Sequence, residues 1–375
     1  MSFFARLFAP PTARFAPPLS ETIDLEDPSV SVDPFPWYER LRSEGDVLHL
    51  SRHGFWIVLG YETVREVFAR PDLFSSAPYE FVDTAMLSAD PPRHGPVRRL
   101  VSRAFGGDML RRLERLAAVR AEELIRPGME IVAEYARPLS RAVAAELIGF
   151  DRRDVAAIAL EEDEAAASGA SDSFERICAR LDALAPRAGM FAGLEGDESG
   201  LVGADEARSL VRLLWLASTA TTERTIAHAV YRLACDSALH RRLREEPDRI
   251  AAFVEEVVRL NPPENLIRRR ALADTSLAGA AIKQGAEVNL CLPAANRDPH
   301  FFETPAALRL DRDGPANLSF GSGIHFCVGA PLTRRVVAAA VAAVVRSSEG
   351  PRLAGEVEWV HAMIVRAPRT LPVAL

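Results

Sequence analysis

The chain has 375 residues, 48% of them hydrophobic, which is enough to bury a large core without disulfides or a structural metal. A net charge of −7 argues against a nucleic-acid surface or a polybasic membrane patch. The apolar residues within 2–10 are interrupted by Arg6 and are too few to span a bilayer. The four cysteines show no metal-ligand spacing. We therefore expect a cytoplasmic protein with no membrane or nucleic-acid partner.

The domain organisation is predicted to be simple. No Gly/Ser-rich, Pro-rich or like-charge run inside the chain has the length of a linker, so residues 1–375 are expected to form a single domain. Prolines gather in residues 1–36, which predicts an extended N-terminal arm lying over the surface before regular structure begins.

Helical periodicity dominates the chain, and short β-like runs occur near each end. In chain order we predict a helix over 37–45, a hairpin of 47–50 and 55–59, successive helices from Tyr61 onward, strands over 275–282 and 287–292, and a last helix from about Ala330. Residues 204–235 form the longest helical stretch, and their middle, 213–217, is apolar on every side, as in a helix that crosses a core. The predicted fold class is mainly α with a small β region.

One segment carries a chemical signal. Residues 320–329 read Phe-Gly-Ser-Gly-Ile-His-Phe-Cys-Val-Gly, so glycines allow unusual backbone torsions just before a cysteine that precedes a helix. A helix N-terminus stabilises a thiolate and lowers its pKa, which suits binding to iron. A buried thiol in a glycine-rich turn is the ordinary alternative for an isolated cysteine.

The same segment resembles the haem-binding signature of cytochrome P450, F-G-x-G-x-H-x-C-x-G, at every specified position. The resemblance implies the cytochrome P450 fold, a helical prism around a buried haem b (iron protoporphyrin IX). Cys327 would be the axial thiolate that favours O–O cleavage. The other residues of the cofactor loop would be Phe320, Gly321, His325 and Gly329.

Further motifs match the family in the same order. Glu256 and Arg259 are three residues apart on a helix, so their charges share a face. Alone, such a pair is usually a solvated surface ion pair. The resemblance implies instead a buried, structural ion pair around the haem. It also implies that His94, Arg98 and Arg269 contact the haem propionates, because guanidinium groups suit buried carboxylates.

The central helix departs from the family pattern, A-G-x-[DE]-T-[ST], since residues 217–222 read Ala-Ser-Thr-Ala-Thr-Thr. Thr221 keeps the position of the catalytic hydroxyl, Ser218 replaces the glycine, and Ala220 replaces the acid. Thr221, Ser218 and Thr222 are the candidate catalytic residues, although a helical threonine often bonds the carbonyl one turn earlier. Glu223 is expected to project from another face and to be a poor substitute for the acid.

The resemblance implies a monooxygenase that inserts one oxygen atom of O2 into a hydrophobic small molecule, by hydroxylation or epoxidation, in secondary metabolism or catabolism. The missing acid leaves alternatives open: oxidative coupling, desaturation, peroxide-driven oxidation, or a non-catalytic recruitment module. The predicted substrate contacts are apolar or aromatic: Tyr79, Phe81, Val82, Leu213, Leu216, Leu266, Ile267, Met363 and Ile364.

Electrons must come from a separate protein, because the chain has no dinucleotide or flavin fingerprint. The resemblance implies a ferredoxin or flavodoxin with its reductase. A basic patch for that partner is predicted from Arg98, Arg99, Arg334 and Arg335. The segment between Gly149 and Ala217 is shorter than in typical relatives, and the resemblance implies either a more open distal pocket or one completed by a partner. The acidic, Ala/Gly-rich composition of 151–197 is also typical of a mobile surface segment.

Overall fold

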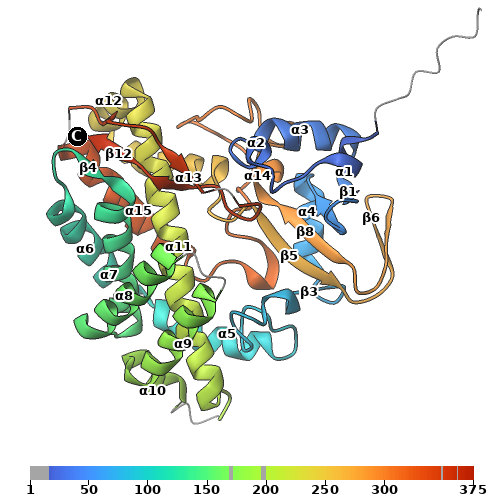
Figure 1. Cartoon of the computed structure of the whole chain (residues 1–375), viewed down its shortest axis with the longest axis horizontal. Coiled ribbons are helices and arrows are strands. Elements are labelled where there is room, and N and C mark those ends of the chain that lie inside the picture. Colours follow the sequence, from blue (N-terminus) through green and yellow to red (C-terminus); the bar gives the residue numbers. More distant parts are fainter. Residues whose placement is uncertain (1–16, 169–171, 196–199, 348, 361) are drawn as a thin grey trace, which may run out of the picture.

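The computed structural model describes residues 17–168, 172–195, 200–347, 349–360 and 362–375. Helices form most of the molecule, and a small sheet lies to one side (Figure 1). The helices are α1 (Leu19–Thr22), α2 (Pro28–Ser31), α3 (Phe35–Glu44), α4 (Tyr61–Ala69), α5 (His94–Ser102), α6 (Gly107–Leu124), α7 (Arg137–Ile148), α8 (Arg152–Ser168), α9 (Ser173–Leu184), α10 (Gly189–Glu195), α11 (Ala204–Cys235), α12 (Ser237–Glu245), α13 (Ile250–Leu260), α14 (Leu292–Ala295) and α15 (Ala330–Ser347). Of these, none combines the length and the apolar composition that a bilayer crossing requires.

The strands are short and fall into four small sheets. They are β1 (Val47–Leu50), β2 (Phe55–Val58), β3 (Phe74–Ser75), β4 (Met129–Glu130), β5 (Leu266–Ala271), β6 (Thr275–Leu277), β7 (Ala280–Ile282), β8 (Glu287–Cys291), β9 (Arg352–Leu353), β10 (Glu358–Trp359), β11 (Pro368–Thr370) and β12 (Pro372–Ala374). The largest sheet has the order β1-β2-β8-β5-β3, and β2 and β8 are its parallel pair. The predicted hairpin is confirmed, with Val47 opposite Val58. Strand β5 was not predicted, because its three consecutive arginines hide the apolar alternation.

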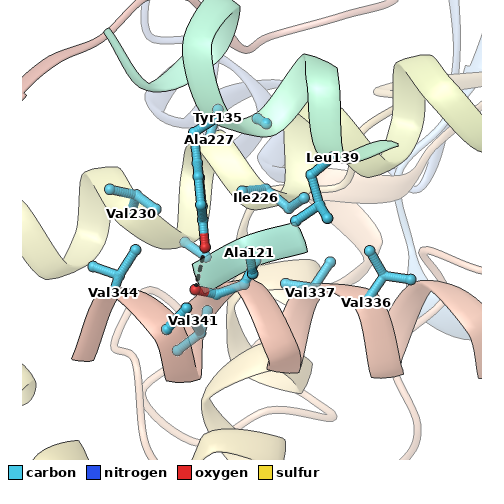
Figure 2. Packing of buried hydrophobic residues seen from close by; sticks show 14 of the residues in the cluster. Ala121, Tyr135, Leu139, Ile226, Ala227, Val230, Val336, Val337, Val341 and Val344 are labelled. Atoms are coloured by element: carbon cyan, nitrogen blue, oxygen red, sulfur yellow. Dashed lines mark hydrogen bonds between the residues drawn. The ribbon is translucent and has the colours of Figure 1, made fainter. Parts of the chain in front are cut away.

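Helix α11 is the axis of the molecule, and its predicted bounds, 204–235, are confirmed. It packs against α7, α15 and α13 (Figure 1). Figure 2 shows this core, where side chains of α11 and α15 meet Tyr135, which lies on a π-helical segment before α7. The buried Tyr135 hydroxyl donates to the Ala340 carbonyl at 2.8 Å. A polar atom at the centre of the core is therefore satisfied, and the hydrogen bond ties the segment before α7 to α15.

The N-terminal arm differs from the prediction. Residues 1–16 of the predicted arm lie outside the described residues, and the rest is not extended, because α1 and α2 form within it. Asp27 caps α2 by accepting a hydrogen bond from the Ser29 N–H. Ile23, Leu25 and Val30 are buried against α3 and the β1–β2 hairpin. Apolar residues between the prolines thus fold this segment onto the sheet.

Residues 151–197 also differ from the prediction of a mobile surface segment. Apart from 169–171 and 196–199, which lie outside the described residues, most of the segment forms helices α8, α9 and α10. Ile158 and Leu181 are fully buried in a cluster that includes Trp215 of α11. The inner faces of these helices pack on the central helix, and part of the acidic composition is enclosed as well: Asp154 is buried, and Glu161 and Glu162 are 13% and 21% exposed.

Candidate functional site

The cysteine loop, residues 320–329, has a backbone that only glycine allows at two positions. Gly321 and Gly323 have φ values of +70° and +68°. A Cβ atom on Gly323 would also overlap the Phe68 carbonyl oxygen of α4. The Cys327 N–H donates to the Phe320 carbonyl at 2.8 Å, which closes the loop directly before α15. The backbone therefore fixes where the Cys327 sulfur points.

The structure corrects the prediction that the helix N-terminus lowers the pKa of Cys327. Burial raises the pKa of the Cys327 thiol, although the N–H groups of Gly329 and Ala330 and the charge of Arg98 act in the opposite direction. The helix N-terminus alone does not make this cysteine a thiolate, because the desolvation cost is larger than the dipole effect. A metal cation bonded to the sulfur would remove that cost, since coordinated thiols are deprotonated.

Four cationic or donor side chains gather beside the loop: His94, Arg98, Arg269 and His325. The rings of His94 and His325 are 4.2 Å apart between centroids, and in the described part of the chain both Nε2 atoms are buried without a hydrogen-bond partner. Arg269 is 4% exposed and donates to the Arg268 carbonyl at 2.8 Å. Arg98 donates to the Phe326 carbonyl. Among the described residues, no carboxylate forms an ion pair with any of the four.

The positive charges of Arg98 and Arg269 are not compensated by an ion pair with any described residue. Burial lowers the pKa of both Arg98 and Arg269. Burial, together with His94, Arg269 and Arg98, lowers the pKa of His325 to about 3. Buried cations are ordinarily paired with anions. The residues present therefore fit a cofactor that brings its own carboxylates to the cysteine loop, as the two propionates of haem do.

Behind the loop, Glu256 and Arg259 form a buried bidentate ion pair, with distances of 2.7 and 2.9 Å and side chains that are 5% and 2% exposed. Arg312 reaches the same carboxylate at 2.8 Å, and the Arg309 N–H donates to it at 2.9 Å. Burial raises the pKa of Glu256, but these hydrogen bonds outweigh it and hold the pKa below its usual value. Sequence analysis missed Arg312, because no local spacing links it to α13. The remaining Arg259 donors bind carbonyls within 296–307.

On the central helix, residues 217–222 form regular α-helix. The Thr221 hydroxyl donates to the Ala217 carbonyl at 2.6 Å, which is the ordinary helical use of threonine. Thr222 is buried, whereas Ser218 is half-buried and Ala217 is exposed. The structure thus places Ala217, Ser218 and Thr221 on the accessible side of the helix and turns Thr222 into the core.

Four predicted substrate contacts lie in or near β5 and before β11. Leu266 is buried and packs with Met363 in the cluster around α3 and the β1–β2 hairpin. Ile267 belongs to a different cluster, because successive strand residues point to opposite faces. Ile364 is exposed. These four residues therefore do not line one side of a single substrate pocket.

The other predicted substrate contacts lie nearer to α11. The Tyr79 hydroxyl accepts the Arg268 N–H at 3.0 Å, and its ring stacks on Phe81. Phe81 is 57% exposed and meets Phe174 of α9 edge-on, with 5.8 Å between centroids. Aromatic contacts thus join the loop before α5 to α9, with Phe81 and Phe174 exposed. The remaining contacts pack in the cluster around α11: Val82, Leu213 and Leu216.

The predicted redox patch carries less free charge than its sequence suggests. Arg334 pairs with Glu255, and Arg335 pairs with Glu114. Arg98 points to the cysteine loop, and Arg99 is exposed. The ion pairs offset much of the positive charge contributed by α15.

A mainly helical fold with a glycine-shaped cysteine loop beside unpaired cations is the arrangement expected of haem-thiolate proteins. A sequence model of the family described as Cytochrome P450 matches residues 188–349. Cytochrome P450 109 of Bacillus spizizenii is 34% identical in an alignment of 336 positions that covers 80% of this chain and 81% of that protein. The chain therefore belongs to the cytochrome P450 family, whose cofactor is haem b with a cysteine thiolate as axial ligand.

Two further relatives support the same family. Cytochrome P450 monooxygenase PikC of Streptomyces venezuelae is 30% identical, with 92% of this chain and 91% of that protein covered. The crystal structure of CYP109E1 from Bacillus megaterium in complex with testosterone matches with a TM-score of 0.83 and 26% identity, covering 91% of this chain and 99% of that one. The cytochrome P450 fold is thereby established, and the protein is a cytochrome P450 monooxygenase, a family that generally takes electrons from redox partners.

Proposed function

We propose that this enzyme inserts one oxygen atom of O2 into an apolar small molecule and releases the other as water. Each turnover consumes two electrons and two protons. Cys327 is the axial ligand, and His94, Arg98, Arg269 and His325 receive the propionates. The observation that carries the proposal is the set of groups beside the cysteine loop: Arg98 and Arg269, which have no ion-pair partner among the described residues, and the buried imidazoles of His94 and His325, whose Nε2 atoms have no hydrogen-bond partner there.

The chain's own residues would hold and enclose the cofactor. Haem supplies the redox chemistry when it is bound. Arg98 binds the Phe326 carbonyl and so ties α5 to the cysteine loop. The ion pair of Glu256 and Arg259 braces the segment that leads to the loop. Ser218 and Thr221 lie on the accessible side of α11, where a hydroxyl can hold a proton-carrying water.

We propose a rigid polycyclic substrate of roughly steroid size. Support comes from the aromatic contacts of Tyr79, Phe81 and Phe174, of which the two phenylalanines are exposed, since large apolar ligands bind to such surfaces. The solved relative that binds testosterone points to the same class. The electron donor is a ferredoxin or flavodoxin with its reductase, and we place its docking on the face of α5 and α15 where Arg99 is exposed.

Peroxide-driven oxidation is a second candidate, favoured by Ala220 and by the Thr221 hydroxyl already bound to Ala217. Turnover of testosterone under 18O2 separates the two. A surrogate ferredoxin and reductase should yield a product with one labelled oxygen, whereas unlabelled hydrogen peroxide alone should give little product. Efficient product formation with peroxide but not with the redox chain would contradict the first proposal. Haem-loaded protein that turns over neither way, with testosterone or a panel of apolar probes, would favour a recruitment module.

A further inference from the structure

A polar cleft of about 230 Å³ opens on α11 directly at Ala220, where the family has its acid. Helices α7, α8 and α11 enclose it. The residues that line it are Arg137, Arg141, Glu162, Asp163, Thr219, Ala220, Glu223 and Arg224. Three arginines and three carboxylates thus face one another, so the cleft offers no net charge to an ionic ligand. Its volume and its polar walls suit several water molecules.

Glu223 is the carboxylate that α11 contributes to the wall of the cleft. It accepts hydrogen bonds from the Arg137 Nε at 3.0 Å and Nη2 at 3.3 Å. On the opposite wall, Arg141 pairs with Glu162, which also accepts the Trp215 Nε1–H at 3.2 Å. Burial lowers the pKa of Arg137, but the hydrogen bond with Glu223 and the attraction to the charges of Glu223, Glu162 and Asp163 together outweigh it and raise the pKa above its ordinary value. Glu223 is therefore held in place at the cleft wall.

Helix geometry connects this cleft to the accessible side of α11. Glu223 does project from a different face than Thr221, as the sequence indicates, but it lies three residues after Ala220 and shares the face of Ala220. Both line the cleft. Ala220 has only a methyl group, so the volume that an acidic side chain would fill remains open to water. Ala220 also directly precedes Thr221, whose hydroxyl lies on the accessible side.

We propose that water in this cleft carries protons past Ala220 to the Thr221 hydroxyl, with Glu223 as the exchanging carboxylate. This inference rests on the proposed monooxygenase function. Glu223 takes a proton from solvent at the open side of the cleft and passes it to a cleft water. The water chain hands a proton to the water bound beside Thr221 Oγ1, and Glu223 returns to its ion pair with Arg137. The relay transfers protons only, and the electrons come from the external redox partner.

Water access to residue 220 is tested without turnover. In haem-loaded protein, a thiol introduced by Ala220→Cys should react with a small water-soluble methanethiosulfonate at least about tenfold faster than one introduced by Ala227→Cys, because thiol reactivity needs solvent access. Ala227 is the matched control, since it lies on the same helix and is fully buried. The parent protein gives the background of exposed Cys235. Equal rates at the two positions would overturn the proposal.

The relay itself is tested by oxygen uptake of the holoenzyme with a surrogate ferredoxin and reductase, without substrate, in H2O and D2O. Glu223→Gln should slow uptake at least about tenfold, because a positioned proton donor is lost and general acid catalysis is weakened. The same variant should increase the solvent isotope effect. Glu287→Gln is the control, because Glu287 forms a similar pair with Arg268 outside the cleft.

Two further variants distinguish the loss of proton transfer from a loss of folded structure. Ala220→Glu in the Glu223→Gln protein should restore the rate, and Ala220→Leu should slow uptake by filling the cleft while the ion pair stays intact. A Glu223→Gln protein that matches the control, or an Ala220→Leu protein that matches the parent, would overturn the relay. A parent without any oxygen uptake would contradict the proposed function instead, and the labelling rates would still decide whether water reaches residue 220.

Discussion

The cysteine loop and the middle of α11 are held in place by different kinds of interaction. In the loop, backbone torsions at Gly321 and Gly323, a buried ion-pair network and buried polar groups without partners all constrain the same site. Residues 217–222 form an ordinary helix whose threonine hydroxyls bond within the helix. Cofactor binding therefore depends on backbone and buried charge, whereas proton delivery depends on a few side chains that can change without disturbing the fold.

The largest expected effect is on the loop side. Glu256→Gln should lower the free energy of unfolding by about 3–5 kcal/mol, because Arg259 and Arg312 would stay buried without their carboxylate. Urea unfolding followed by circular dichroism measures this loss. Glu287→Gln, in a half-exposed pair, should cost about 1 kcal/mol or less. Equal losses in the two variants would show that the buried network has no special part in stability.

A smaller effect is expected at the cationic group. Arg269→Met should weaken haem retention by about 1–3 kcal/mol, the scale of a hydrogen bond to a charged group. Haem transfer to apomyoglobin measures retention. The neighbouring Arg268 already pairs with Glu287, so Arg268→Met is the control and should retain haem like the parent. If both variants lose haem at the same rate, Arg269 does not contact the propionates.

The lowered pKa of His325 predicts a pH dependence of haem-free protein. The folded state keeps His325 neutral down to about pH 3, whereas the unfolded state takes up a proton below its ordinary pKa of about 6.5. Its contribution to stability is complete above that value and is lost as the pH falls toward 3, by about 1.4 kcal/mol per unit. His325→Gln should flatten this slope in urea titrations, and bound haem should flatten it too, since propionates stabilise the imidazolium. An unchanged slope in the variant would contradict the assignment.

The smallest effect on structure is expected at α11. Thr221→Ala removes one local hydrogen bond, so stability should change by less than about 1 kcal/mol and haem content should not change. The share of electrons that ends in hydrogen peroxide should rise, since the proton donor is lost. Loss of haem from this variant would erase the distinction between the two regions.

Elements whose pattern is local were predictable from the sequence. The bounds of α11 and the β1–β2 hairpin followed from apolar periodicity, and the cysteine loop followed from its motif. Strand β5 and the Arg312 contact were not predictable, because the first is rich in arginine and the second joins segments 56 residues apart. The pKa of Cys327 was predicted in the wrong direction, since burial depends on the whole fold. The cleft at Ala220 required the packing of three helices.

The most direct test of the central claim is the absorption spectrum of the reduced, carbon-monoxide-bound protein. Haem-loaded parent and the Thr221→Ala variant should both show the strongly red-shifted Soret band of thiolate ligation, and Cys327→His should lack it while Cys235→Ser keeps it. Absence of the shifted band in folded, haem-loaded parent, or its persistence after Cys327→His, would contradict the account.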